Sequence, residues 1–153
     1  MRLPFWRLAG AILLFSTLFN LLTAHVGETE LAAFALTITE DAEALRYYQL
    51  AASVLLQPAA PQWLYLGCLE GQPVATAELT IAGGVAGLYN ITTLPAYRGR
   101  GIGSAMTWQP LLDARAAGLG AAVLQAADAG VNVYRRIGFA PFGVITEYKP
   151  PAG

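Results

Sequence analysis

The sequence predicts an α+β fold in which a central mixed sheet is flanked by helices. Short apolar runs rich in β-branched residues alternate with longer segments of helical periodicity. Glycine-rich or proline-rich turns separate many of these segments, and no internal repeat interrupts the order. At 153 residues, the chain has the length of one domain that buries its own core.

The first half of the predicted domain begins with a strand and a helix. Residues 35–39 form a short β-branched run, which predicts the strand. Glu40 and Asp41 then begin a helix that extends to about Val54, because acidic side chains suit the positive end of the helix dipole. Two prolines mark 57–62 as a loop.

Three strands follow this loop. Residues 63–69 and 74–81 are apolar runs joined by the turn at 70–73, which predicts a hairpin. A Gly-Gly turn at 83–84 leads into a third strand over 85–94.

The last part of the chain continues the alternation. A helix is predicted over 102–117, with Gly118 as its C-cap residue and Pro110 as a point of kinking. The remaining segments are predicted as a buried strand, a short helix and a last strand or strand pair: 121–126, 130–137 and 139–148.

Composition excludes several classes of function. The net charge is −1 and no basic run occurs, so no nucleic-acid surface is expected. Cys68 is the single cysteine, which excludes a disulfide framework and suits a buried strand position in a reducing compartment. His25 is the single histidine, and one histidine with one cysteine does not close a coordination sphere, so no metal is predicted.

The loop over 94–104 carries the strongest functional signal. It follows a β-branched strand and opens into a helix, so it directs free backbone N–H groups and a helix dipole at one point. An anion, most often a phosphate, binds at such a point, and Arg98 and Arg100 add forked cationic donors.

Spacing decides between the known phosphate loops. A Walker A loop requires a lysine, and the single lysine, Lys149, lies far from this loop. A dinucleotide fingerprint requires Gly-x-Gly-x-x-Gly, which the glycines here do not match. The pattern present is Arg-x-x-Gly-x-Gly, formed by Arg98, Gly101 and Gly103.

This segment resembles the coenzyme-A-binding motif of the GNAT superfamily of N-acetyltransferases. A second stretch, residues 133–139, resembles the tyrosine-bearing helix of that family and its following Gly-Phe pair. The resemblance extends over residues 35–149. The family has two helices between its first two strands, whereas here the second is reduced to 57–62 or missing.

The resemblance implies a mostly antiparallel sheet with a V-shaped splay between its two central strands. It also implies acetyl transfer from acetyl-CoA to a primary amine of a small molecule or a protein. The backbone of the strand before the loop would bind the pantetheine arm, and the loop would bind the pyrophosphate. The implied cofactor-binding residues are Ile91, Thr92, Thr93, Arg98, Gly99, Arg100, Gly101, Ile102, Gly103 and Ser104. Many members have Asn or Ser where Ala127 stands, and Asn132 is the candidate replacement.

Two catalytic roles follow from the resemblance and from acyl-transfer chemistry. Tyr134 matches the tyrosine that protonates the departing thiolate, and packing of a short helix is its alternative role. Glu78 is the candidate to accept the proton of the amine, directly or through water, and Glu147 is the second candidate. For each carboxylate, a solvated position on a strand remains the alternative. Four aromatic residues either line the acceptor pocket or belong to the core: Tyr47, Tyr48, Trp63 and Tyr89.

Residues 1–34 form an apolar segment set apart from the domain at 35–150. Within it, residues 8–24 carry no charge and follow Arg2 and Arg7. This stretch is short for a membrane-spanning helix, which needs about 20 apolar residues, and its end is a poor signal-peptide cleavage site. We favour a helix that packs on its own domain or on a second copy in a homodimer, because acetyl-CoA is a cytoplasmic metabolite. Attachment to the cytoplasmic face of a membrane is the second interpretation.

The expected activity has one rival. A non-catalytic acyl-CoA-binding or interaction module, derived from a truncated GNAT domain, would explain the missing helix and Ala127. The complete loop and Tyr134 favour the enzyme.

Overall fold

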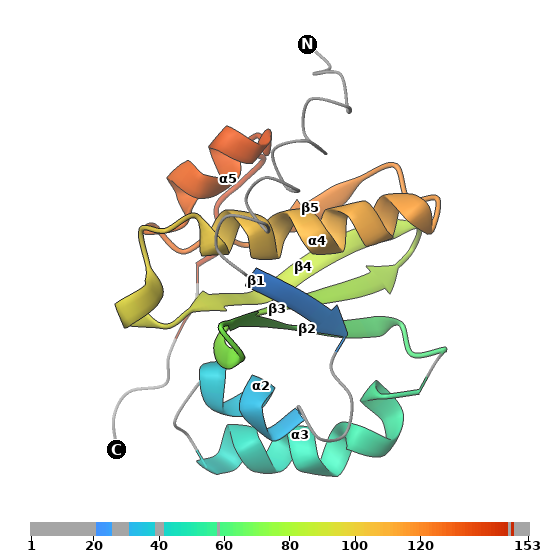
Figure 1. Ribbon diagram of the computed structural model, residues 1–153. Helices are drawn as coiled ribbons and strands as arrows, with labels where there is room; N and C mark the ends of the chain where they lie inside the picture. The colour runs from blue at the N-terminus through green and yellow to red at the C-terminus, as the bar shows by residue number, and fades with distance from the viewer. Residues whose placement is uncertain (1–20, 26–30, 39–41, 58, 147, 149–153) are drawn as a thin grey trace.

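The computed structural model describes residues 21–25, 31–38, 42–57, 59–146 and 148, which form a layered α+β domain (Figure 1). Five strands make one sheet in the order β1-β2-β3-β4-β5. The strands are β1 (Leu21–His25), β2 (Gln62–Leu69), β3 (Gln72–Ala82), β4 (Val85–Thr93) and β5 (Ala122–Leu124). The helices are α2 (Leu31–Ile38), α3 (Ala42–Leu55), α4 (Ile102–Ala116) and α5 (Val131–Ile137), with a 3-10 turn at Pro95–Tyr97.

The sheet is mostly antiparallel, which confirms the predicted fold class. Strands β1 to β4 pair antiparallel in sequence order, and β4 pairs in parallel with β5. That last pairing covers only 86–88 against 122–124, whereas β4 continues to Thr93. The two strands therefore separate beyond Leu88, as the predicted splay requires.

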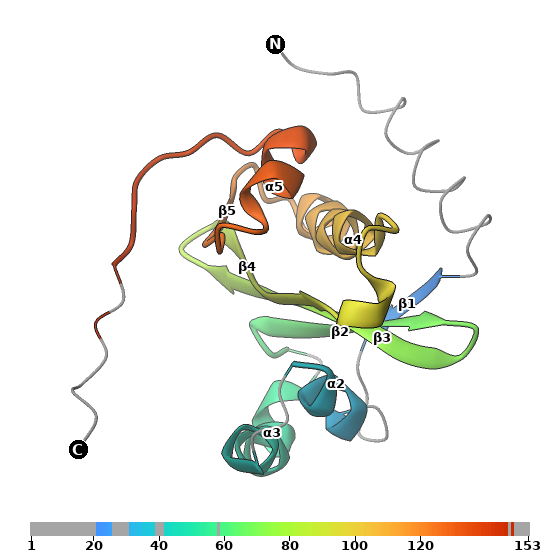
Figure 2. The ribbon, with the colours of Figure 1, turned by 90° about the vertical axis from the view of Figure 1, so that its left-hand side faces the viewer.

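Each face of the sheet carries its own core. Helices α2 and α3 cover one face, and α4 and α5 cover the other (Figure 2). The α4-side core includes Tyr65, Leu79, Leu88, Ile102 and Met106. The α2–α3-side core is formed by Phe34, Ala35, Tyr48, Leu55, Leu64 and Leu66. Consecutive strand residues point to opposite faces, so β2 contributes side chains to both cores.

The prediction of a helix over 8–24 is wrong for its C-terminal residues, 21–24. Residues Leu21–His25 form β1, which pairs with β2 from Leu21 opposite Leu69 to His25 opposite Tyr65. An apolar run beside the edge of a sheet gains a hydrogen-bond ladder with the neighbouring strand, and this outweighs its helical propensity. Residues 8–20 lie outside the described part of the chain, and within that part no helix is long and apolar enough to cross a membrane.

The strand predicted over 35–39 is also wrong, because residues 31–38 form helix α2. Phe34 and Ala35 are fully buried against the sheet. A helix that is apolar on nearly all sides is buried, and its sequence resembles a strand when read locally. Two helices, α2 and α3, therefore separate β1 from β2, so the helix that the sequence analysis considered missing is present.

The last strand or strand pair predicted at 139–148 does not form among the described residues 139–146 and 148. This segment leaves the body of the molecule as an extended tail (Figure 2). Phe142, Val144 and Tyr148 are almost wholly exposed. Alternating apolar residues favour an extended backbone, but a strand also requires a neighbouring ladder.

Candidate active site

A groove of about 690 Å³ lies beside β4 where that strand separates from β5. Its walls come from β4, the loop before α4, the start of α4, the segment after β5, and α5. We call it the β4–α4 groove. It brings together most of the residues predicted to bind the cofactor: Ile91, Thr92, Thr93, Arg98, Gly99, Gly101, Ile102, Gly103 and Ser104. Tyr134 lies in the same groove.

Two predicted cofactor residues do not line the groove. The Arg100 guanidinium lies 5.9 Å from the centre of the Tyr97 ring, in a cation–π contact. Asn132 uses its backbone oxygen to accept a hydrogen bond of 3.0 Å from Arg136 Nε. Arg136 itself lines the groove and was not predicted. No sequence signal identifies it, because the orientation of α5 decides which of its side chains face the groove.

The loop before α4 is shaped by glycine. Gly99 and Gly101 have φ angles of 73° and 79°, in the left-handed region that glycine adopts without strain. Gly101 is the N-cap of α4 and supplies no side-chain cap, so the first N–H groups of the helix stay available to a ligand. Arg98 ties the loop to β4, because its Nε donates a hydrogen bond of 3.0 Å to the Thr93 carbonyl.

This helix start fits a pyrophosphate. Among the described residues, a Cβ added at Gly103 would touch only Thr93 Oγ1, at 3.7 Å. The space above Gly103 is therefore open to a ligand, and the free N–H groups and helix dipole favour an anion there.

The exposed edge of β4 suits an amide-bearing chain. On one side β4 pairs with β3, with Thr92 opposite Thr76 and Thr93 opposite Ala75. On the other side no β5 residue pairs with β4 beyond Leu88 in the described chain. The backbone groups on that side face the groove and can pair with an extended ligand as an added strand would.

Tyr134 is held by α5 and by the turn after it. Its ring packs over Gly130, where an added Cβ would lie 2.9 Å from Cε2 of the ring. Phe139 makes an edge-to-face contact with the ring at a centroid distance of 6.2 Å. Burial raises the pKa of Tyr134 above its ordinary value of 10.0, so the hydroxyl is protonated at neutral pH.

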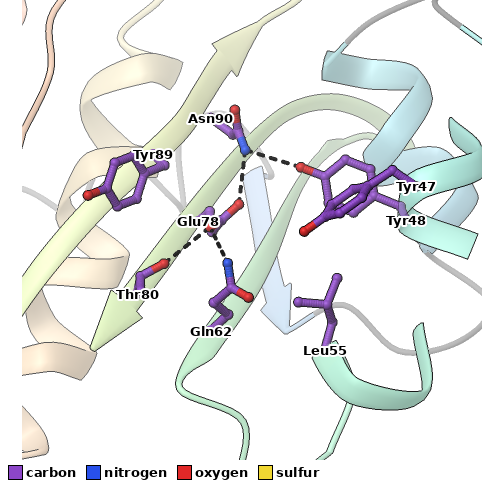
Figure 3. A pocket seen from close by; sticks show the side chains of 8 residues that line it. All are labelled: Tyr47, Tyr48, Leu55, Gln62, Glu78, Thr80, Tyr89 and Asn90. Atoms are coloured by element: carbon purple, nitrogen blue, oxygen red, sulfur yellow. Dashed lines mark hydrogen bonds between the residues drawn. The ribbon is translucent and has the colours of Figure 1, made fainter. Parts of the chain in front are cut away.

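A second cavity, of about 430 Å³, opens on the α2–α3 side of the sheet (Figure 3). We call it the Glu78 pocket. It is lined by Tyr47, Tyr48, Leu55, Gln62, Glu78, Thr80, Tyr89 and Asn90. Three of the four aromatic residues proposed for an acceptor pocket are therefore at this site. Trp63 is not among them and packs against the α4-side core.

Glu78 is the centre of a hydrogen-bond network. Its Oε1 accepts hydrogen bonds from Gln62 Nε2 at 2.9 Å and from Thr80 Oγ1 at 3.2 Å. Its Oε2 accepts one from Asn90 Nδ2 at 2.9 Å. The side chain is only 6% exposed, so Glu78 is not a solvated strand carboxylate. All three donors are neutral, so they solvate the negative charge without cancelling it.

A β-bulge places Asn90 in this network. Thr76 pairs with Thr92 and Glu78 pairs with Tyr89, so β4 has one residue more than β3 in this interval. Asn90 has a φ of 49°, and its carbonyl accepts a hydrogen bond of 2.8 Å from Thr76 Oγ1. Asn90 was not predicted from the sequence. An asparagine in the middle of an apolar strand, tolerant of the left-handed region, was the available signal.

Tyr48 completes the network from α3. Asn90 Nδ2 donates a second hydrogen bond, of 3.1 Å, to the Tyr48 hydroxyl oxygen. Burial, followed by the negative charge of Glu78 and then by Tyr47, raises the pKa of Tyr48 to about 12. The hydroxyl therefore stays protonated and can donate a hydrogen bond to a bound ligand.

The two cavities meet at Tyr89 and Asn90, which line both. Tyr89 pairs with Glu78 across the strands and shares its face of the sheet. Its ring lies over Gly87, where an added Cβ would lie 2.7 Å from Cε2 of the ring. A ligand in the β4–α4 groove and one in the Glu78 pocket would therefore approach each other past this ring.

The other candidate residues have smaller roles or lie outside the described chain. Cys68 is half-buried in β2 and contacts the α2–α3-side core. Glu147 is not among the described residues. Within the described part of the chain, no three His, Cys, Asp or Glu side chains lie close enough to hold a metal ion.

Comparison with known proteins identifies the family. The sequence profile of the Acetyltransferase (GNAT) family matches residues 18–139, so the match also covers β1. The groove, the glycine loop and the separated strands thus belong to an acetyltransferase domain, and the chain is a member of the GNAT family. None of the curated proteins matches the sequence significantly.

Solved structures show the same fold at low sequence identity. A predicted acetyltransferase from Clostridium acetobutylicum, solved with acetyl-CoA, is 16% identical with a TM-score of 0.65, covering 84% of this chain and 96% of the other. AAC(6')-Iy, bound to a bisubstrate analogue, is 14% identical with a TM-score of 0.69, covering 86% and 99%. Glucosamine-6-phosphate N-acetyltransferase from Arabidopsis thaliana is 11% identical with a TM-score of 0.67, covering 84% and 97%.

Proposed function

We propose that this protein transfers the acetyl group of acetyl-CoA to a primary amine. The meeting of two cavities at Tyr89 and Asn90 carries the proposal. A donor that lies along 91–93 with its pyrophosphate at the start of α4 brings its thioester to this junction. An amine in the Glu78 pocket reaches the same point from the other face of the sheet.

The structural relatives support the nature of both substrates. One of them was solved with acetyl-CoA, and AAC(6')-Iy was solved with an analogue that joins CoA to an acetylated amine compound. The Arabidopsis thaliana relative is by name an N-acetyltransferase of an amino sugar phosphate.

The reaction forms a nitrogen–carbon bond and breaks a carbon–sulfur bond. An N–H group at the separated edge of β4 can donate to the thioester oxygen as negative charge develops there, a contribution of about 3 kcal/mol where such donors have been removed. The leaving sulfur needs a proton. Tyr134 supplies it, because its hydroxyl lies in the groove and burial keeps it protonated.

The attacking nitrogen must lose protons. An amine arrives as an ammonium ion at neutral pH and becomes a nucleophile only when it is neutral. The ammonium ion loses one proton before it attacks, and the nitrogen loses a second as the amide forms. Glu78 is the carboxylate in the pocket, and it accepts the first proton directly or through a water molecule. The second restores the hydroxyl of Tyr134, which has given its own proton to the sulfur.

Replacement of Tyr134 by Phe tests the proposal. This change removes the hydroxyl and leaves the ring packing over Gly130. Turnover with a confirmed amine should fall by about 10²–10⁴-fold, the usual contribution of a positioned proton donor. Release of free CoA thiol measures turnover, and calorimetry should show CoA affinity within about threefold of the wild type, because the helix start that binds the pyrophosphate is unchanged.

Tyr148→Phe is the matched control, since Tyr148 is exposed on the tail. Near-full turnover of the Tyr134→Phe variant would remove Tyr134 from the mechanism. A wild-type protein that binds CoA but acetylates none of a broad amine panel would instead be the non-catalytic module.

A further inference from the structure

Building on the proposed acetyl transfer, we propose that the Glu78 pocket selects its acceptor by charge. The acceptor class is a compact amine that enters as a cation and has no carboxylate beside the amino group. Amino acids and other amines with an adjacent anionic group are excluded.

The charge balance of the pocket is the first argument. Glu78 is the one acidic residue among the described residues that line it, and no Lys or Arg is among them. Its three hydrogen-bond donors are neutral amide and hydroxyl groups. A nearly buried charge without a countercharge is costly, and a cationic ligand relieves that cost.

The aromatic walls are the second argument. Tyr47 and Tyr89 are 57% and 42% exposed, which is high for large rings that belong to a pocket. Tyr47 and Tyr48 stand edge to face at 5.2 Å. In Figure 3 they lie together on one side of Glu78, and Tyr89 lies on the other. Ring faces attract organic cations that have lost part of their water. The volume of about 430 Å³ is at the lower end for ligand sites, so the acceptor is small.

The lack of any Lys or Arg among the described lining residues argues against the competing class. An α-carboxylate lies within two bonds of the amino carbon, so it would enter the pocket together with the ammonium group. It would meet the like charge of Glu78, and none of the described lining residues is a cation that could bind it. Repulsion between the two negative charges therefore discriminates strongly against acceptors that carry a carboxylate.

Matched pairs of acceptors isolate this effect. Phenethylamine with phenylalanine, and tyramine with tyrosine, differ only by the carboxylate beside the single amino group. The wild type should prefer the decarboxylated member of each pair by at least about 30-fold in kcat/KM. Glu78→Gln should reduce that preference to about threefold or less, whereas Glu70→Gln, on an exposed turn, should leave it unchanged. The ratio within a pair cancels any loss of proton acceptance, because both members need the same chemistry.

A second variant tests the aromatic wall and leaves Glu78 intact. Gly87→Ala should displace the Tyr89 ring, because the new Cβ would lie 2.7 Å from it. KM for the preferred amine should rise at least about fivefold. Gly120→Ala is the control, because an added Cβ there meets no described atom within 4 Å.

The outcomes separate this inference from the proposed function. Equal or better use of the amino acids by the wild type overturns the charge selection and leaves acetyl transfer intact. An unchanged KM in Gly87→Ala overturns the aromatic wall. If no amine is acetylated, the proposed function fails, and calorimetry of the same pairs with the CoA-bound protein still tests selection. Equal affinity within each pair then overturns it, and preference for the amine supports it.

Discussion

The free space at the Cβ position of Gly103 determines how closely a ligand can approach the start of α4. Gly103 has an ordinary backbone conformation, and a Cβ there would contact only Thr93 Oγ1 among the described residues. The fold therefore accepts alanine at this position, and the requirement for glycine comes from the ligand.

Gly103→Ala should weaken CoA binding by about 10- to 100-fold, because the methyl group would separate the pyrophosphate from the helix N–H groups. The melting temperature should stay close to that of the wild type. Calorimetry and thermal melts measure the two effects, and Gly120→Ala provides the control. Wild-type affinity in Gly103→Ala would show that the pyrophosphate binds elsewhere.

Among single residues, the sequence indicated those whose position in the groove follows from local spacing. The glycines and Arg98 were found because a loop before a helix requires them in that order. Asn90 and Arg136 were not, because a bulge in β4 and the orientation of α5 place them. Arg100 was predicted from its charge alone, and the turn instead directs it to Tyr97.

Among the elements, α4 makes the main contact with its face of the sheet. Met106 is fully buried at the centre of the α4-side core. Met106→Ala should lower the free energy of unfolding by about 2–5 kcal/mol, because it removes buried apolar surface and leaves a cavity. Urea unfolding measures the change.

Leu50→Ala is the matched control for that experiment. Leu50 is exposed on α3, so its truncation should change the free energy of unfolding by less than about 0.5 kcal/mol. A loss below 1 kcal/mol in Met106→Ala would mean that α4 does not anchor the core.

Sequence predicted elements well where local pattern and tertiary position agree. The β2–β3 hairpin, β4, α3 and α4 were found because turn residues and periodicity mark them. α2 was misassigned because it is apolar in nearly every position, and β1 because it continues the apolar run that begins at residue 8, so local sequence does not distinguish strand from helix in either. The tail has a strand pattern, but no pattern within it specifies a partner strand.

At the scale of the whole molecule, the exposure of the C-terminal tail predicts that its side chains contribute little to the stability of the fold. Phe142 is fully exposed. Phe142→Ser should therefore change the free energy of unfolding by less than about 0.5 kcal/mol. Phe34→Leu, which alters a fully buried ring, should destabilise the fold by more than about 1 kcal/mol in the same urea titration. A comparable loss in Phe142→Ser would show that the tail packs against the domain or a second copy.

The separate cores on the two faces of the sheet have a consequence for how such a domain diversifies. Leu88 and Ile102 support the β4–α4 groove from the α4-side core, and Tyr48 and Leu55 join the Glu78 pocket to the α2–α3-side core. Because the two sets of supporting contacts are separate, substitutions on one face leave the packing of the other largely intact. Apart from changes at Tyr89 and Asn90, which line both cavities, mutation on the α2–α3 face can therefore change acceptor preference over generations while donor binding stays constant. The sheet that separates the cores thus divides the protein into one part that is free to vary and one that is held fixed by the donor it binds.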